Sequence, residues 1–326
     1  MTSGKWKTVF APIFGATLLV TILFLSDPGA IIARLRGARP DLILLGLFLV
    51  QIQIVLSALR WGYTAARLGH RLPLRRAIAD YYLGSLANMV LPGGMAGDVM
   101  RTARNRSADR SWGIPVMAVM MERFAGQIAL VVIGCAGLIA WPFLNGGLRP
   151  SEAFVLLSVF LGLAVLAAAA TLLAWLSGSP WWRRLVQKIG RSASACYGLP
   201  YAWLVQGVLS LTIVASYIAV FALASAAIGA SLPAIGLLTI VPVCLLTMIV
   251  PVTIGGWGTR EAAAAALWPF LGMTADQGVA ASVMYGIIVT AGALPGLLTL
   301  AMPGLQEAER DPVARRTKID ISRPKE

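Results

Sequence analysis

The sequence predicts an all-α polytopic integral membrane protein, with about six full crossings and two re-entrant hairpins of broken helix arranged as an inverted repeat. Three observations predict this fold. The 326 residues are 58% hydrophobic and 13% charged, with mean hydropathy +0.78, whereas soluble domains carry about 25% charged residues. Several apolar runs approach the roughly 20 residues that a membrane-spanning helix needs. Two similar glycine-rich interruptions lie half a chain apart, NMVLPGGMAGDVMR at 88–101 and MIVPVTIGGWGTRE at 248–261.

The N-terminal segment is predicted to be the first crossing. Lys5 and Lys7 precede the apolar run 8–25, an order that signal peptides share, but the run is too long for one and no A-x-A cleavage site follows. Because positive residues favour the cytoplasmic side, this helix would cross outward. Residues 42–59 would return to a basic linker, which we expect to lie along the membrane interface.

Residues 77–91 are expected to form a hairpin rather than a crossing. They are too short to span the bilayer comfortably, and they end at LPGG, which the basic stretch RTARNRSADR follows. Basic flanks on both sides indicate that the chain dips into the membrane from the cytoplasm and returns. Residues 114–141 would then cross outward, and 153–176 would cross back to the basic linker WWRRLVQKIGR.

The C-terminal half is predicted to repeat this order from the opposite side. Residues 202–228 would cross outward to the uncharged linker GASLP. Residues 234–250 would enter the membrane and break at PVTIGGWG, and the short apolar piece 262–270 would return outward. Residues 279–302 would be the last crossing, and 305–326 would form a disordered cytoplasmic tail.

An internal repeat relates the two interruptions. A shift of 162 residues places Gly93-Gly94 on Gly255-Gly256 and places 42–59 on 204–221. The first hairpin would open to the cytoplasm and the second to the outside, so the copies would be inverted. This predicts a membrane domain over 1–304, with repeat 1 at about 41–141 and repeat 2 at about 202–304.

Inverted repeats with discontinuous helices are typical of transporters, whose binding site lies near the bilayer midplane. Irregular backbone in hydrocarbon leaves peptide groups unpaired unless it lines a cavity or is buried in protein. Pro92 and Pro251 would end the entering helices, and the N–H groups of the helices that follow could face an anion. The alternative is that the glycines only allow close helix packing.

Charged residues lie within or beside the predicted membrane segments. A charge near the bilayer centre costs about 2.5–3.5 kcal/mol on insertion scales, so each should face a cavity or a partner. Glu122 and Arg123 are adjacent and cannot pair well on one helix. The charges could form a structural ion-pair network, or the arginines could hold a phosphodiester while the acids orient them or meet a cationic headgroup. Asn88, Trp257 and Tyr285 could line the same space. The charged set comprises Asp98, Arg101, Glu122, Arg123, Arg260 and Glu261.

Composition argues against several other classes of function. The net charge of +13 is concentrated in the linkers, as the positive-inside rule requires, so no nucleic-acid partner is expected. His70 is the only histidine, and the three cysteines form no CxxC spacing, which disfavours a metal site or a histidine-based triad. We predict no catalytic residue, no metal ligand set and no cofactor.

The two glycine-rich motifs, together with MERFAGQ at 121–127, resemble the transmembrane flippase-like region of the lysylphosphatidylglycerol synthetases, a family that includes stand-alone members. The resemblance covers about 42–304. It places Asp98 where the family often has glutamate, which shortens the reach of the carboxylate. The resemblance and the charge pattern give these candidate substrate-binding residues: Asn88, Pro92, Gly93, Gly94, Asp98, Arg101, Glu122, Arg123, Gly255, Gly256, Trp257, Gly258, Arg260, Glu261 and Tyr285.

The resemblance implies a flippase-like transporter that moves an aminoacylated or glycosylated lipid between leaflets, and the arginines favour an anionic one. We expect the chain in the cytoplasmic (inner) membrane, and the placement of the basic residues puts both termini in the cytoplasm. Its partners would be the lipid substrate and an enzyme of lipid biosynthesis. No Walker motif is present, and flow down a gradient made by a synthetic enzyme would suffice to drive the transport. No soluble aminoacyl-transferring domain follows residue 326, so we expect no lysyl transfer and no enzyme. The alternatives are an intramembrane lipid-modifying enzyme and an accessory subunit of lipid or glycan biosynthesis.

Overall fold

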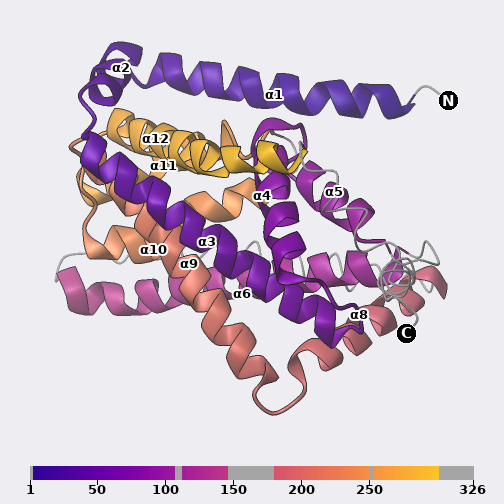
Figure 1. Cartoon of the computed structure of the whole chain (residues 1–326). Helices are drawn as coiled ribbons and strands as arrows, with labels where there is room; N and C mark the ends of the chain where they lie inside the picture. Colours follow the sequence, from indigo (N-terminus) through magenta and orange to yellow (C-terminus); the bar gives the residue numbers. More distant parts are fainter. Residues whose placement is uncertain (1–2, 107–111, 146–179, 250–252, 301–326) are drawn as a thin grey trace, which may run out of the picture.

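The computed structural model describes residues 3–106, 112–145, 180–249 and 253–300, and these residues form helices without any β-strand (Figure 1). Four helical stretches are long and apolar enough to cross a membrane. A fifth crossing is added if the pair of helices that meets at a 92° bend near Ser26 counts as one span. The four stretches are Pro40–Arg67, Gly113–Trp141, Ala202–Ala227 and Ala275–Leu300. The predicted membrane-helical fold is therefore confirmed.

The N-terminal half begins with two helices that meet at the bend. Asp27 accepts hydrogen bonds from the Gly29 and Ala30 amides and so caps the second of them, as N-cap aspartates commonly do. A long helix, a shorter one, a glycine break, a short helix and a long helix follow. These elements are α1 (Ser3–Leu25), α2 (Pro28–Arg36), α3 (Pro40–Arg67), α4 (Leu74–Val90), α5 (Ala96–Arg104) and α6 (Gly113–Asn145).

The C-terminal half repeats the order of elements found from α3 to α6. A long helix is followed by a shorter one, a second glycine break, a short helix and a final long helix. Short 3-10 turns follow three of these helices. The elements are α8 (Pro180–Tyr197), α9 (Ala202–Ala227), α10 (Ala234–Leu246), η1 (Thr247–Ile249), α11 (Thr259–Leu267), η2 (Trp268–Leu271), α12 (Ala275–Ala293) and η3 (Leu294–Leu300).

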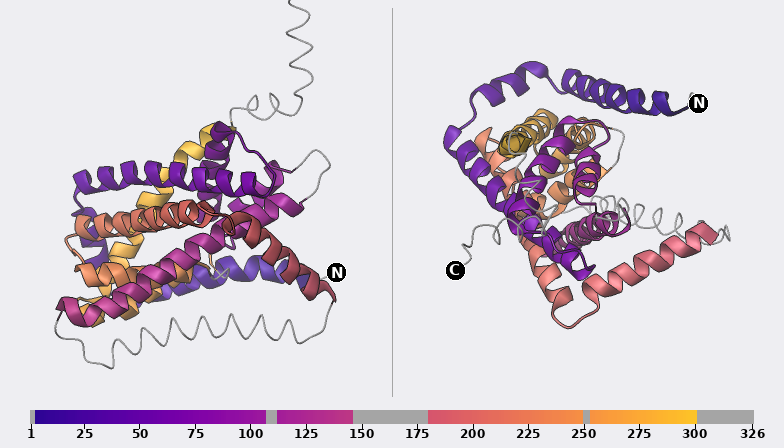
Figure 2. Two further views of the ribbon diagram at one scale, coloured as in Figure 1. Left: turned by 90° about the horizontal axis from the view of Figure 1, so that it is seen from below. Right: turned by 45° about the vertical axis from the view of Figure 1, so that its right-hand side comes forward.

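The helices pack so that the two halves interlock. The long helices α3 and α9 lie side by side, and α12 packs against both of them. In the same way α6 packs against α9 and α3, and α10 lies along α6. The right-hand view of Figure 2 shows α1 and α2 on one side of the bundle, whereas α8 extends away from it on another. The first glycine break lies partly at the surface of this bundle, since Leu91 and Met95 beside it are exposed.

Two expectations about element boundaries need correction. The predicted crossing 42–59 belongs to α3, which continues to Arg67, so Arg60 lies inside a helix instead of in an interfacial linker. The basic stretch after the first break folds in part as α5, whose Asp98 and Arg101 are buried. Both segments are amphipathic enough to continue as helix once their charges find buried partners. The predicted crossing 153–176 and the tail 305–326 lie outside the described residues.

Candidate functional site

The two glycine breaks are in direct contact. Pro92 and Ile254 form an isolated antiparallel bridge, and the Gly93 amide donates a hydrogen bond to the Thr253 carbonyl over 3.2 Å. Gly255 packs directly on α4, because a Cβ there would lie 2.8 Å from the Met89 Cα. The φ of Gly255 is +55°, a region that glycine adopts without strain. Each break therefore satisfies part of the backbone of the other, half a chain away.

One amide at the start of each helix that follows a break is already occupied. The Gly97 amide donates to the Asn88 side-chain oxygen over 2.8 Å, and the Gly258 amide donates to Glu261 over 2.7 Å. These contacts act as N-terminal caps within the protein. The sequence suggested that such amides could face an anion. Since Asn88 and Glu261 take these two donors, neither is open to an anion, and the arginines described next are the charged donors of this region.

A buried ion-pair cluster joins α3, α5 and α6. The Arg60 Nη2 atom lies 2.5 Å from the Glu122 Oε1 atom, and the Arg101 Nη2 atom lies 3.4 Å from the Glu122 Oε2 atom. On α5, the Arg101 Nη2 atom lies 2.5 Å from the Asp98 Oδ1 atom. The Asp98 Oδ2 atom lies 2.6 Å from the Arg123 Nη2 atom. As expected, Glu122 and Arg123 each pair with residues on other helices.

Aromatic rings hold the central arginine of this cluster in place. The Arg101 guanidinium carbon lies 4.3 Å from the centre of the Tyr81 ring and 4.9 Å from that of Trp61. Such cation–π contacts fix the plane of a guanidinium as well as stabilising it. The Tyr81 hydroxyl also donates to Glu122 over 3.2 Å. Arg101 is therefore oriented both by carboxylates and by rings.

A second, separate ion pair follows the second break. The Arg260 Nη2 atom lies 2.6 Å from the Glu261 Oε1 atom, and Ser282 bridges the pair by accepting from Arg260 and donating to Glu261. Both charged side chains are fully buried. The Arg260 guanidinium lies 5.1 Å from the ring centres of Trp257 and Tyr285. This pair is electrically neutral and fully buried, although the Arg260 Nη1 atom makes no hydrogen bond among the described residues.

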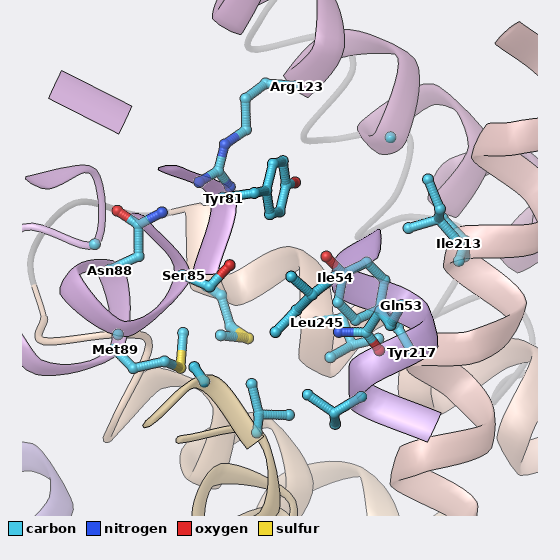
Figure 3. Close-up of a pocket in the computed structure, with 18 of the residues that line it drawn as sticks. Gln53, Ile54, Tyr81, Ser85, Asn88, Met89, Arg123, Ile213, Tyr217 and Leu245 are labelled. Carbon is cyan, nitrogen blue, oxygen red and sulfur yellow. The ribbon is translucent and has the colours of Figure 1, made fainter. Parts of the chain in front are cut away.

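A cavity of about 180 Å³ lies between the two breaks and the first cluster. Figure 3 shows the Arg123 side chain entering it beside Tyr81, with Asn88 and Met89 on one side and Gln53 and Tyr217 on the other. Apolar side chains of α3, α6, α9 and α10 complete the lining. The cavity thus has a charged end and an apolar remainder, as ligand pockets commonly do.

An apolar groove of about 590 Å³ lies on the other side of the same breaks. It is lined by α1, α12, the end of α4 and the second break, including Ile254 and Trp257. Met89 lines both the groove and the cavity. The contact between the breaks therefore separates a charged cavity from a hydrocarbon-like groove.

The structure distributes the predicted site residues over five places. Pro92 and Gly93 form the contact between the breaks, Asp98 pairs with the arginines behind the cavity, and Trp257 lines the groove. Gly256, Gly258, Arg260 and Glu261 belong to the second break and the neutral pair that follows it. Seven predicted residues line the cavity: Asn88, Gly94, Arg101, Glu122, Arg123, Gly255 and Tyr285.

Sequence reasoning missed several cavity residues. Arg60 was assigned to a linker because it stands one residue after the apolar run 42–59, and only its position within α3 brings it to Glu122. Gln53, Ser85 and Gln127 were not among the candidate residues, although all three line the cavity and Gln127 ends the motif at 121–127. Polar residues inside otherwise apolar helices were the available signal, because their burial in a membrane is costly.

Two comparisons relate the chain to known proteins. The sequence profile of one protein family, described as "Lysylphosphatidylglycerol synthase TM region", matches residues 10–296. No curated protein matches the chain. The family match covers both breaks, both ion-pair groups and the cavity.

Proposed function

The chain belongs to the lysylphosphatidylglycerol synthase TM region family, and we propose that it moves a lipid between the two leaflets of a bilayer. The lipid would be of the anionic, aminoacylated or glycosylated class. One observation carries the proposal: the two helix breaks touch at the boundary between a charged cavity and an apolar groove. A translocated lipid has the same two parts, a charged head and a hydrocarbon tail.

The physical difficulty in moving a lipid is its headgroup. A charge taken from water into hydrocarbon loses several kcal/mol or more of hydration unless other charges replace the water. Arg60, Arg101 and Arg123 present guanidinium groups at the cavity, and guanidinium groups match the geometry of a phosphodiester. Bound there, the headgroup would exchange water for arginine while the acyl chains remain in the groove or in the bilayer.

The breaks supply the route between the two spaces. Met89 lines both, and Gly255 lies against its backbone. Among the described residues the breaks are joined by the Pro92–Ile254 bridge, to which the hydrogen bond from the Gly93 amide to the Thr253 carbonyl belongs. Parting them would cost little compared with unfolding a helix, because glycine-rich backbone tolerates several conformations. Movement at this contact would open the charged cavity toward the groove.

The membrane context of the proposal follows the charge pattern. We place the chain in the cytoplasmic membrane with both termini in the cytoplasm, because the basic linkers would then lie on that side. Transport would run down the gradient set up by an enzyme that makes the lipid in one leaflet, and such an enzyme is the expected partner. No catalytic step is assigned to this chain.

The proposal is tested with purified protein in vesicles that contain a trace of fluorescent, tail-labelled phosphatidylglycerol. Dithionite added outside reduces only the label of the outer leaflet, so loss of the inner-leaflet signal reports translocation. We expect the protein to make the inner pool accessible. Because hydrogen bonds to charged groups contribute about 1.5–3 kcal/mol, Arg123→Gln should slow the rate about tenfold or more.

Arg184→Gln is the matched control. Arg184 is an exposed arginine on α8 that donates to the Pro180 carbonyl of its own helix. Its loss removes the same charge without touching the cavity, so its rate should equal that of the wild type. Vesicles that keep their inner-leaflet signal in the presence of folded wild-type protein would refute the proposal.

A further inference from the structure

We propose that the cavity selects a headgroup of net negative charge, such as a single phosphodiester without an ammonium group, and that a cationic lysyl ester of phosphatidylglycerol is its poorer ligand. This inference rests on the proposed function, since it names the class of lipid for the same site. It departs from the aminoacylated lipid that the name of the family suggests. Four features of the first ion-pair cluster carry it.

The cluster has an excess of positive charge. Three arginines, Arg60, Arg101 and Arg123, face two carboxylates, Asp98 and Glu122, which leaves one unbalanced positive charge among the described residues of the cluster. The pair after the second break contributes nothing to this count, because it is neutral. An anion that enters the cavity would neutralise this excess charge, because charges at a cavity wall attract a ligand of the opposite sign.

Both carboxylates are already occupied. Each oxygen of Glu122 lies within 3.4 Å of an arginine nitrogen, and its Oε1 atom also accepts from Tyr81. Each oxygen of Asp98 lies within 2.6 Å of an arginine nitrogen. An ammonium group would have to displace an arginine to reach either acid. The acids therefore orient the arginines, which decides between the two roles that the sequence left open for them.

Hydrogen-bond donors of the cluster remain without an acceptor. Arg101 is 2% exposed and Arg60 is 4% exposed, yet the Arg101 Nη1 and Arg60 Nε atoms make no hydrogen bond. Both side chains line the cavity. Buried donors are nearly always paired, and the oxygens of a phosphodiester are acceptors that would suit these arginines. Two amide oxygens of the lining, Gln53 Oε1 and Gln127 Oε1, also lack a partner, but they carry no charge.

The third arginine is the accessible one. The Arg123 side chain is 43% exposed, whereas its partner Asp98 is almost completely buried. Figure 3 shows Arg123 reaching into the cavity beside Tyr81. Arg123 is thus the arginine of the cluster that a ligand can reach from outside the cavity. Phosphatidylglycerol would neutralise the cluster, and lysyl-phosphatidylglycerol, with a net charge of plus one, would double the imbalance.

The experiment compares three tail-labelled lipids in the same neutral vesicles: phosphatidylglycerol, lysyl-phosphatidylglycerol and phosphatidylcholine. Wild-type protein should translocate phosphatidylglycerol at least about tenfold faster than the other two, because one buried charge-assisted contact corresponds to about that factor. Arg123→Glu reverses the sign of the cluster and should shift the ratio toward lysyl-phosphatidylglycerol by about tenfold or more. Arg184→Glu makes the same charge change on α8 and should leave the ratio unchanged.

A binding measurement separates the two proposals. Water-soluble dioctanoyl-phosphatidylglycerol should raise the unfolding temperature of the wild type in detergent, because a ligand that binds only the folded state stabilises it. Its lysyl ester should not, and Arg123→Glu should lose the response while remaining folded. Equal translocation of all three lipids, or a larger thermal shift with the lysyl ester, overturns the charge selection but leaves transport standing. A thermal shift with phosphatidylglycerol alone, without translocation of any lipid, overturns transport and keeps the selection.

Discussion

The excess positive charge of the first ion-pair cluster predicts that neutralising Glu122 and neutralising Arg60 lower the free energy of unfolding by different amounts. Glu122 is 1% exposed and Arg60 is 4% exposed, and the atoms that pair them lie 2.5 Å apart. Removing one partner of a buried ion pair costs about 3–5 kcal/mol, because the other charge stays buried and unpaired. However, the variants Glu122→Gln and Arg60→Gln leave the cluster with different net charges.

Glu122→Gln raises the cluster from one excess positive charge to two, and Arg60→Gln brings it to neutrality. In the second variant Glu122 keeps the Arg101 nitrogen at 3.4 Å and the Tyr81 hydroxyl at 3.2 Å. We therefore expect a loss of unfolding free energy near the top of the range for Glu122→Gln, about 4–5 kcal/mol, and about 3 kcal/mol or less for Arg60→Gln. In the double variant the losses should fall short of their sum by about 1–3 kcal/mol, since the residues are in contact.

The assay is chemical unfolding in detergent micelles without added anionic lipid, with all four members of the mutant cycle. The matched control is the exposed pair of Arg39 and Asp41, whose Nη2 and Oδ2 atoms lie 2.6 Å apart at the surface. Its cycle should show no coupling beyond experimental error, because exposed pairs contribute little. If Arg60→Gln proved as costly as Glu122→Gln, or the two losses were additive, the reasoning from net charge would be wrong.

Two further predictions concern the first hairpin. Gly97→Ala should destabilise the protein by about 3 kcal/mol or more in a thermal unfolding assay, through overpacking. A Cβ at Gly97 would fall on the Gly84 carbonyl group and lie 2.8 Å from the Gly84 Cα. Gly190→Ala is the control: its Cβ meets nothing within 4 Å, so it should be neutral or slightly stabilising in the same assay. Asn88→Ala should lower the free energy of unfolding by about 1–3 kcal/mol, since it leaves the buried Gly97 amide without its acceptor at 2.8 Å. Asn88→Asp keeps an oxygen at that position and should cost less. An equal loss from both variants would contradict the capping role of Asn88.

Much of the architecture could be predicted because hydropathy is a local property. The runs 42–59, 114–141, 202–228 and 279–302 correspond to the four stretches that are long and apolar enough to cross. The glycine pairs were placed at breaks, where they adopt positive φ values. Boundaries were less accurate, because a helix such as α3 continues past its apolar run as long as its polar residues find partners.

The site was predictable in its residue types but not in its pairings. Arg101, Glu122 and Arg123 were singled out because charges in apolar helices are costly, and all three line the cavity. Their partners could not be read from spacing: Glu122 and Arg60 are 62 positions apart in the chain. Arg260 and Glu261, expected in the same set, instead form a separate closed pair with Ser282.

The sequence by itself determined that this chain belongs in a bilayer. It also determined the positions at which the helices are interrupted and the charged side chains that need a partner within the protein. Tertiary structure alone decided that the two interruptions touch, that Arg60 joins the acids of α5 and α6, and that the cluster is left one positive charge out of balance. Transfer from water to oil depends on each segment's own composition. Coulomb interactions depend on distances between segments, and only the packing of α3, α5 and α6 sets those distances.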